Sequence, residues 1–164
     1  MIFVTVGTHE QQFDRLLKCI DKMVEENKIK EKVIMQTGYS NYEPKHCEHH
    51  KLIGYEDMQK YIQEADIVVT HGGPASFIDP LSVGKIPVVV PRKKDFDEHV
   101  NNHQLDFAKE VEKRMKNIIV AETEEEIVNS IVNYKKIVKK ISGELASNNK
   151  KFNIDLAKEI EAII

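Results

Sequence analysis

The fold is decided by the stretch Ile67-Val68-Val69-Thr70-His71-Gly72-Gly73-Pro74-Ala75-Ser76. Its first four residues are apolar or β-branched and predict a buried, central strand that ends at the histidine and the two glycines. A helix is expected over 75–83, because Pro74 suits a first helical position and Gly84 suits a C-cap. A buried strand that passes through glycines directly into a helix is typical of a βα unit in a parallel sheet.

The same alternation continues on both sides of this unit. Strands are predicted over 2–6, 33–37, 52–54, 88–90 and 118–120. Helices are predicted over 13–24, 57–64, through 105–111, from Thr123 onward and over 152–163, with a loop over 38–51. The pattern indicates an α/β fold with a Rossmann-like parallel sheet and helices on both faces.

Three local signals refine the helices. Thr123 followed by Glu126 forms a capping-box signature for a helix start. Pro80 is expected to distort its helix or confine it to a short element, because proline removes a helical hydrogen bond. The pair Ser142-Gly143 is expected to break the helical pattern before the last, amphipathic helix.

Length and composition favour one globular domain. The chain has 164 residues with 41% hydrophobic content, so residues 1–164 are interpreted as a single domain with 123–164 as a helical C-terminal extension. The formal net charge of -3 gives no broad cationic field, and nucleic acid is not expected as a partner. The first residues lack a basic segment followed by a long apolar run, so a cytoplasmic chain is expected. Cys19 and Cys47 are interpreted as reduced thiols without a special role.

The loops that follow strands are the first places to look for a site, because ligands of open α/β sheets bind beyond the carboxyl ends of the strands. These loops are 7–12, 70–74 and 92–102. In the second of them the glycines allow close backbone approach, and the following helix offers free backbone N–H groups at its positive end. This turn suits a diphosphate, although a tight turn with only a capping role explains the same residues.

Several polar side chains extend this candidate site. Ser76 can donate to a phosphate, and Asp79, one helical turn later, can accept hydrogen bonds from ribose hydroxyls or can be a solvated carboxylate. The segment 92–104 gathers cations, histidines and amides that can hold an anionic, hydroxyl-rich ligand, or form a solvated charged loop. His9 is a candidate general base, with a surface histidine as the alternative.

Other constellations are set aside. The run His46-Cys47-Glu48-His49-His50 has spacings that fit no usual zinc pattern, and no metal is expected there. The sequence contains neither GxGxxG after the first strand nor GxxxxGK[ST], which argues against a dinucleotide dehydrogenase and a P-loop phosphotransferase. A different phosphate-binding turn is therefore expected.

Three motifs together resemble the C-terminal domain of glycosyltransferase family 28. They are 71–76, then Gly84-Lys85-Ile86-Pro87-Val88-Val89-Val90-Pro91, then Asn102-His103-Gln104, and with Phe3-Val4-Thr5-Val6-Gly7-Thr8 the resemblance spans about residues 1–120. It is greatest with the small subunits of two-part transferases: those of dolichol-linked GlcNAc transfer and, above all, those of bacterial capsule and exopolysaccharide galactosyltransferases.

The resemblance implies a GT-B fold cut in two, in which this chain supplies the UDP-sugar domain. A membrane-associated partner would supply the acceptor domain and recruit the chain to the inner face of the membrane. The implied reaction transfers a hexose, with galactose favoured, from a UDP-sugar to a polyprenyl-diphosphate-linked saccharide. It proceeds with inversion and needs no metal or cofactor. The implied donor site comprises Gly7, Thr8, His71, Gly72, Gly73, Ala75, Ser76, Asp79, Arg92, His103 and Gln104.

Two alternative functions stay open at this point. One is a non-catalytic enhancer that only activates its partner, and the other is a GT-B-like epimerase, for which the chain is too short. The donor sugar is not decided by the sequence, because discrimination among hexoses rests on a few hydrogen bonds.

Overall fold

The computed structural model describes residues 1–145 and 158 of the chain. One parallel sheet of six strands runs through it in the order β3-β2-β1-β4-β5-β6. The strands are β1 (Ile2–Thr5), β2 (Val33–Gln36), β3 (Glu48–His50), β4 (Ile67–His71), β5 (Val88–Val90) and β6 (Ile119–Val120). This is the Rossmann strand order, in which the order reverses between β1 and β4. The predicted α/β fold class is confirmed.

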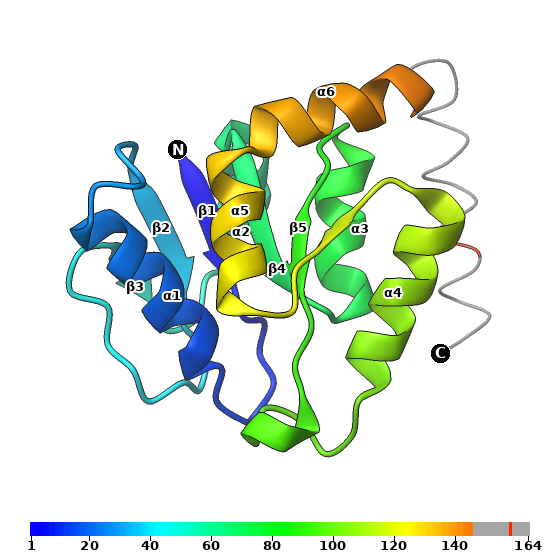
Figure 1. Ribbon diagram of the computed structural model, residues 1–164. Coiled ribbons are helices and arrows are strands. Elements are labelled where there is room, and N and C mark those ends of the chain that lie inside the picture. The colour runs from blue at the N-terminus through cyan, green and yellow to red at the C-terminus, as the bar shows by residue number, and fades with distance from the viewer. Residues whose placement is uncertain (146–157, 159–164) are drawn as a thin grey trace.

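Helices cover both faces of the sheet. They are α1 (Asp14–Glu25), α2 (Tyr55–Glu64), α3 (Pro74–Ser82), α4 (His103–Met115), α5 (Glu124–Val132) and α6 (Tyr134–Leu145), with a short 3₁₀ helix η1 (Lys94–Phe96). Figure 1 shows α1 and α5 on the viewer's side of the sheet, α6 across the top and η1 at the bottom. The strands run downward in this view, so their carboxyl ends lie at the bottom.

Alternation along the strands explains the two layers of helices. Val4 and Val69 point to the layer of α1 and α5, where they share one apolar core with Leu17 and Ile127. Their neighbours in sequence point to the other face, where smaller cores form against α2 and against α3 and α4. Because the inner strands β1, β4 and β5 are covered on both sides, they read as continuous apolar runs.

The first edge strand differs from the prediction. The sequence favours a strand at 52–54, whereas β3 is Glu48–His50 and lies in the predicted loop. This edge strand pairs only with β2, through Ile34 opposite Glu48, and its side chains stay partly exposed. An edge strand does not need an apolar sequence, so hydrophobicity alone misplaces it.

The helices after β6 also correct a boundary. The Thr123–Glu126 capping box is confirmed at the start of α5. The break expected at Ser142-Gly143 is wrong, because α6 continues through it to Leu145 and the helices separate at Asn133 instead. A glycine near a helix end costs only about 1 kcal/mol. Apart from residue 158, the predicted helix over 152–163 lies outside the described residues.

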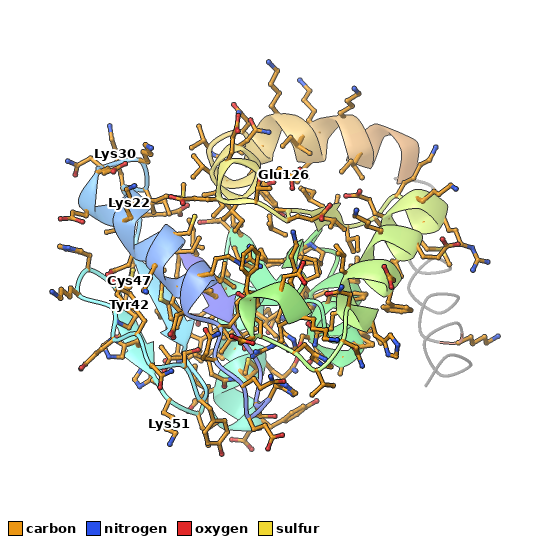
Figure 2. The ribbon with its side chains drawn as sticks, turned by 60° about the horizontal axis from the view of Figure 1, so that its bottom comes forward. Lys22, Lys30, Tyr42, Cys47, Lys51 and Glu126 are labelled. Carbon is orange, nitrogen blue, oxygen red and sulfur yellow. The ribbon has the colours of Figure 1, made fainter. Side chains whose placement is uncertain are left out.

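A buried carboxylate organises the loop between β2 and β3. Asp21 of α1 accepts hydrogen bonds from the Tyr42 hydroxyl at 2.5 Å and from the backbone N–H groups of Lys45 and His46. Figure 2 shows Tyr42 and Cys47 side by side on this flank of the molecule. Burial, followed by the charge of Asp21, raises the pKa of the Cys47 thiol to about 12, and both cysteines are free thiols. Within the described part of the chain, no helix is long and apolar enough to cross a membrane.

Candidate functional site

A pocket of about 480 Å³ opens at the carboxyl ends of β1 and β4, where the strand order reverses. This is the position at which doubly wound sheets bind their ligands. Its walls come from the turns after β1 and β4 and from α2, α3 and α4. The lining residues are Thr5, Gly7, Thr8, His9, Gln36, Met58, Ile62, His71, Gly73, Pro74, Ala75, Ser76, Asp79 and Gln104.

Hydrogen bonds to two buried side chains fix the turn after β1. Gly7 has a φ of 73°, a left-handed conformation that glycine adopts without strain. The Gly7 N–H donates to Thr5 Oγ1 at 3.1 Å, and Gln36 Nε2 donates to the Gly7 carbonyl oxygen at 3.3 Å. The turn therefore has a fixed shape at the edge of the pocket.

His71 ends β4 and lies between two glycines. A Cβ atom on Gly7 would lie 2.3 Å from His71 Nε2, and one on Gly73 would lie 2.3 Å from His71 Cε1. The imidazole thus occupies the space that two missing side chains leave free. Burial, followed by the positive charge of Arg92, lowers the pKa of His71 to about 3, so the ring is neutral at neutral pH.

The hydrogen bonds of this neutral ring define its tautomer. The Gly73 N–H donates to His71 Nδ1 at 3.1 Å, so Nδ1 carries no proton. The proton is therefore on Nε2, which lies 2.7 Å from Ser76 Oγ and donates to it. Since the Ser76 oxygen accepts from His71, its own O–H remains available to donate to a ligand.

The start of α3 offers further donors to an anion. The first turn of a helix has backbone N–H groups without intrahelical partners and lies at the positive end of the helix dipole. Pro74 has no N–H, and the Ser76 N–H donates to the Gly73 carbonyl oxygen at 3.0 Å. The Ala75 N–H and the helix dipole are therefore what this turn offers a ligand in the pocket. Together with the Ser76 hydroxyl, this helix end can hold a phosphate group.

The other end of the pocket combines one carboxylate with apolar side chains. Asp79, on the next turn of α3, accepts a hydrogen bond on Oδ2 from Gln59 Nε2 of α2 at 3.2 Å. Oδ1 has no such bond from Gln59 and can accept from a hydroxyl group. Met58 and Ile62 of α2 supply apolar surface nearby. Pro80 lies within α3, which ends two residues later, so the expected short helix is confirmed.

His9 lines the pocket from the loop between β1 and α1. Its ring stacks on the ring of His99 with centroids 4.6 Å apart and planes 8° from parallel. His9 Nε2 lies 2.9 Å from Gln11 Oε1. Burial, followed by the charges of His9 and Arg92, lowers the pKa of His99.

Arg92 does not line the pocket, contrary to the donor contact expected of it. Its side chain is fully buried, and its guanidinium donates to the carbonyl oxygens of Val6 at 2.7 Å, Gln11 at 2.9 Å and Glu98 at 3.0 Å. Burial lowers its pKa to about 10, which leaves it charged at neutral pH. Arg92 follows β5 in the sequence, and its hydrogen bonds to Val6 and Gln11 hold the β1–α1 loop in place.

Of the other residues predicted to contact the donor, some line the pocket and some do not. Gln104 lines the pocket, and its Oε1 accepts a hydrogen bond from the backbone N–H of Arg92 at 3.3 Å. Gly72 lies behind the pocket, where a Cβ atom would meet Gln104 Cβ at 3.0 Å and Pro91 Cα at 3.1 Å. The His103 side chain is exposed and does not line the pocket.

Sequence reasoning missed the residues that support the site from other elements. Gln36 is a buried polar residue at the end of a predicted apolar strand, and that contrast is the signal that marks it. Gln59, Met58 and Ile62 carry no local signal, because only the packing of α2 against α3 brings them to the pocket. In the part of the chain that the structure describes, no three His, Cys, Asp or Glu side chains are arranged to hold a metal ion.

Sequence comparisons place the chain among glycosyltransferases. The family model described as the glycosyltransferase family 28 C-terminal domain matches residues 1–161. The UDP-N-acetylglucosamine transferase subunit ALG13 of Homo sapiens is 36% identical over 121 residues, which cover 68% of this chain and 10% of that protein. The subunit of the same name from Yarrowia lipolytica is 32% identical over 84 residues, covering 46% of this chain and 41% of that protein. The chain thus spans only part of each relative.

Solved structures agree on the fold. The glycosyltransferase SnogD from Streptomyces nogalater superposes with a TM-score of 0.59 at 13% identity, covering 98% of this chain and 43% of that one. MurG from Acinetobacter baumannii superposes with a TM-score of 0.57 at 15% identity, covering 94% of this chain and 49% of that one. The chain therefore has the fold of about one half of a two-domain GT-B glycosyltransferase.

Proposed function

The chain belongs to the glycosyltransferase family 28 C-terminal domain family, and from this premise we propose that it is the donor-binding subunit of a two-component, UDP-sugar-dependent glycosyltransferase. The observation that carries the proposal is the pocket between the turns after β1 and β4. The α3 N-terminus and Ser76 meet the diphosphate, Asp79 meets the ribose, and Met58 and Ile62 provide apolar contact for the base. Gly7 and Thr8 close the pocket above the diphosphate.

The donor is proposed to be UDP-N-acetylglucosamine. This rests on the names of the relatives, which specify that nucleotide sugar. The sequence alone favours galactose and capsule or exopolysaccharide synthesis, and none of these appears in those names. UDP-galactose is therefore the comparison ligand in the test below.

The proposed chemistry is a single displacement with inversion. The acceptor oxygen forms a bond to the anomeric carbon while the bond from that carbon to the β-phosphate oxygen breaks, and UDP leaves. The proton of the acceptor hydroxyl passes to the unprotonated nitrogen of His9. The charge that develops on UDP is met by the α3 N-terminus and the Ser76 hydroxyl, without a bound metal or cofactor.

A partner subunit is proposed to cover the pocket and hold the acceptor. Among the described residues, most of the large hydrophobic side chains that are exposed follow β2, β3 or β5, at the same end as the pocket: Tyr39, Leu52, Tyr55, Phe96 and Val100. Tyr55 is 77% exposed and Val100 is 67% exposed. Such apolar surface around an open pocket fits a protein interface. A membrane-associated partner that binds a polyprenyl-diphosphate acceptor would bring this chain to the inner face of the membrane.

Calorimetric titration of the isolated chain tests the donor site. UDP and UDP-N-acetylglucosamine are titrated in the presence of a chelator, with UDP-galactose alongside. We expect binding without metal, at least tenfold weaker in Asp79→Ala because a ribose contact of about 1.4 kcal/mol is lost. Glu110→Ala, an exposed carboxylate on α4, is the matched control and should bind like the wild type.

The alternative is a non-catalytic enhancer, in which this chain only activates the partner that holds the donor site. A folded chain that binds no UDP alone or with its partner supports the enhancer and overturns the proposal. UDP binding that Asp79→Ala leaves unchanged would place the nucleotide elsewhere.

A further inference from the structure

The stack of His9 on His99 joins two loops that lie far apart in the sequence. His9 lies between β1 and α1, and His99 lies between β5 and α4. Their rings are nearly parallel, at 8°, with centroids 4.6 Å apart. At this distance and angle the two rings are in face-to-face contact.

Buried charged groups fix both loops independently of the rings. The Glu98 carboxylate is 1% exposed and accepts two hydrogen bonds from Arg15, each 3.0 Å long. The Arg92 guanidinium donates to the carbonyl oxygens of Gln11 and Glu98, which belong to the two different loops. Gln12 Nε2 adds a hydrogen bond to the Phe96 carbonyl oxygen at 3.0 Å. The stack is therefore built into the fold and is not a chance contact of two surface side chains.

Gln11 selects one tautomer of His9. The Gln11 Oε1 atom only accepts hydrogen bonds, so the His9 nitrogen 2.9 Å away, Nε2, carries the proton. Nδ1 is then the unprotonated nitrogen of a ring that lines the pocket. An imidazole held in one tautomer by an oxygen acceptor is the arrangement that a general base requires.

The surroundings of His99 favour a neutral ring. The Asn101 N–H donates to His99 Nδ1 at 3.4 Å, which is a bond to the unprotonated nitrogen of a neutral ring. The charged or titratable groups that act on the His99 ring are His9, Arg92 and His103. The carboxylate of the adjacent Glu98 is paired with Arg15. His9, Arg92 and His103 are cationic or can become so, and they oppose a positive charge on His99.

We propose that His99 is a positioning residue, whose neutral ring stacks on His9 and, together with Gln11, holds the His9 imidazole in one plane and one tautomer with Nδ1 unprotonated. The proposal rests on the proposed function only for the use of that nitrogen as a base. The geometry that it predicts exists in the isolated chain without any ligand.

Long-range ¹H–¹⁵N spectroscopy of the histidine-labelled, full-length chain tests this directly, because ¹⁵N shifts distinguish the two tautomers. In the wild type, His9 is expected to show one neutral tautomer, with Nδ1 unprotonated. His99→Phe keeps a stacking face and should preserve that signature. His99→Ala removes the face and should give a mixture of both tautomers, as should Gln11→Ala through loss of the acceptor.

His50→Ala, which removes an exposed histidine on β3, is the control and should leave His9 unchanged. The backbone amide spectra of β1 and β4 show whether each variant is folded. A wild-type His9 that averages both tautomers overturns the proposal, even if a variant does not fold. An unchanged His9 in folded His99→Ala also overturns it. UDP binding is measured separately, so a failure of the positioning role is distinguishable from a failure of the donor site.

Discussion

At the scale of single residues, the site depends on the absence of a side chain at position 73. The His71 ring fills the space beside Gly73, where a Cβ atom would lie 2.3 Å from Cε1. Gly73→Ala must therefore displace the imidazole that donates to Ser76. We expect a loss of about 1–3 kcal/mol in the free energy of unfolding, the usual cost of overpacking, and a loss of UDP binding.

Urea unfolding and UDP titration measure these two effects. Gly54→Ala is the matched control, because no atom lies within 4 Å of the Cβ that it adds. An unfolding free energy of Gly73→Ala equal to that of the Gly54→Ala control would contradict the tight packing described for His71.

Ser76 is expected to contribute to ligand binding, and also to folding, because it accepts the hydrogen bond of the buried His71 ring. Its O–H is free to donate, and a hydrogen bond to a charged phosphate contributes about 1.5–3 kcal/mol. Ser76→Ala should weaken UDP binding by about tenfold to a hundredfold in calorimetry. Ser82→Ala removes a hydroxyl from the far end of the same helix, where it donates to the Asp79 carbonyl oxygen at 2.7 Å, and should bind normally. Equal affinities of the two variants would remove Ser76 from the site.

The residues that the sequence identifies best are those whose role is local. The turn from His71 to Ser76 is visible in the sequence, because a strand, two glycines and a proline follow one another there. Arg92 shows the limit of this reasoning. Its position after a strand predicts a ligand contact, but its orientation is set by carbonyl oxygens about eighty residues away.

At the scale of elements, an ion pair with a buried carboxylate joins α1 to the β5–α4 loop. Glu98 is 1% exposed, and its carboxylate faces Arg15 while its carbonyl oxygen accepts from Arg92. Glu98→Ala leaves Arg15 without its carboxylate, but Arg15 is 20% exposed and keeps the carbonyl oxygens of Glu122 and Pro91 as acceptors. The cost is therefore at or below the lower end of the roughly 3–5 kcal/mol of a fully buried pair. We expect a loss of this size in the free energy of unfolding by urea.

Glu26→Ala is the control for a surface pair. Glu26 lies near Lys22 and Lys28 at the exposed end of α1, and its removal should change the unfolding free energy little. If the two variants were equally stable, Glu98 would not join these elements.

Elements with internal periodicity are predictable, and elements defined by their neighbours are not. The apolar spacing of α1 and the capping box of α5 locate these helices from the sequence alone. The edge strand β3 is polar and exists because β2 offers it a pairing partner. The pocket walls from α2 likewise follow from packing and have no sequence pattern of their own.

At the scale of the whole molecule, the stability should depend on the protonation of His71. The unfolded chain takes up this proton near the ordinary pKa of 6.5, whereas the folded chain does so only at about 3. Between these values the unfolded state binds more protons, so stability falls as the pH falls, by about 1.4 kcal/mol per pH unit at most. The pKa of His99 is also lowered and acts in the same direction.

Urea unfolding at about pH 7 and about pH 5.5 measures this dependence, a window that lies above the ordinary pKa values of carboxyl groups. His71→Asn should show a smaller difference between the two pH values than the wild type. An equal difference in both proteins would mean that His71 is not buried as a neutral ring.

The Arg92 side chain has a consequence for how the protein acquires its pocket. Its bond to the Val6 carbonyl oxygen joins residues 86 positions apart in the sequence. Contacts between such distant residues form only after a long loop has closed, and they slow folding. The β1–α1 loop therefore reaches its final shape only after β5 has joined the sheet. In a refolding experiment, the ability to bind nucleotide should appear with the last kinetic phase, after most of the helical signal has returned.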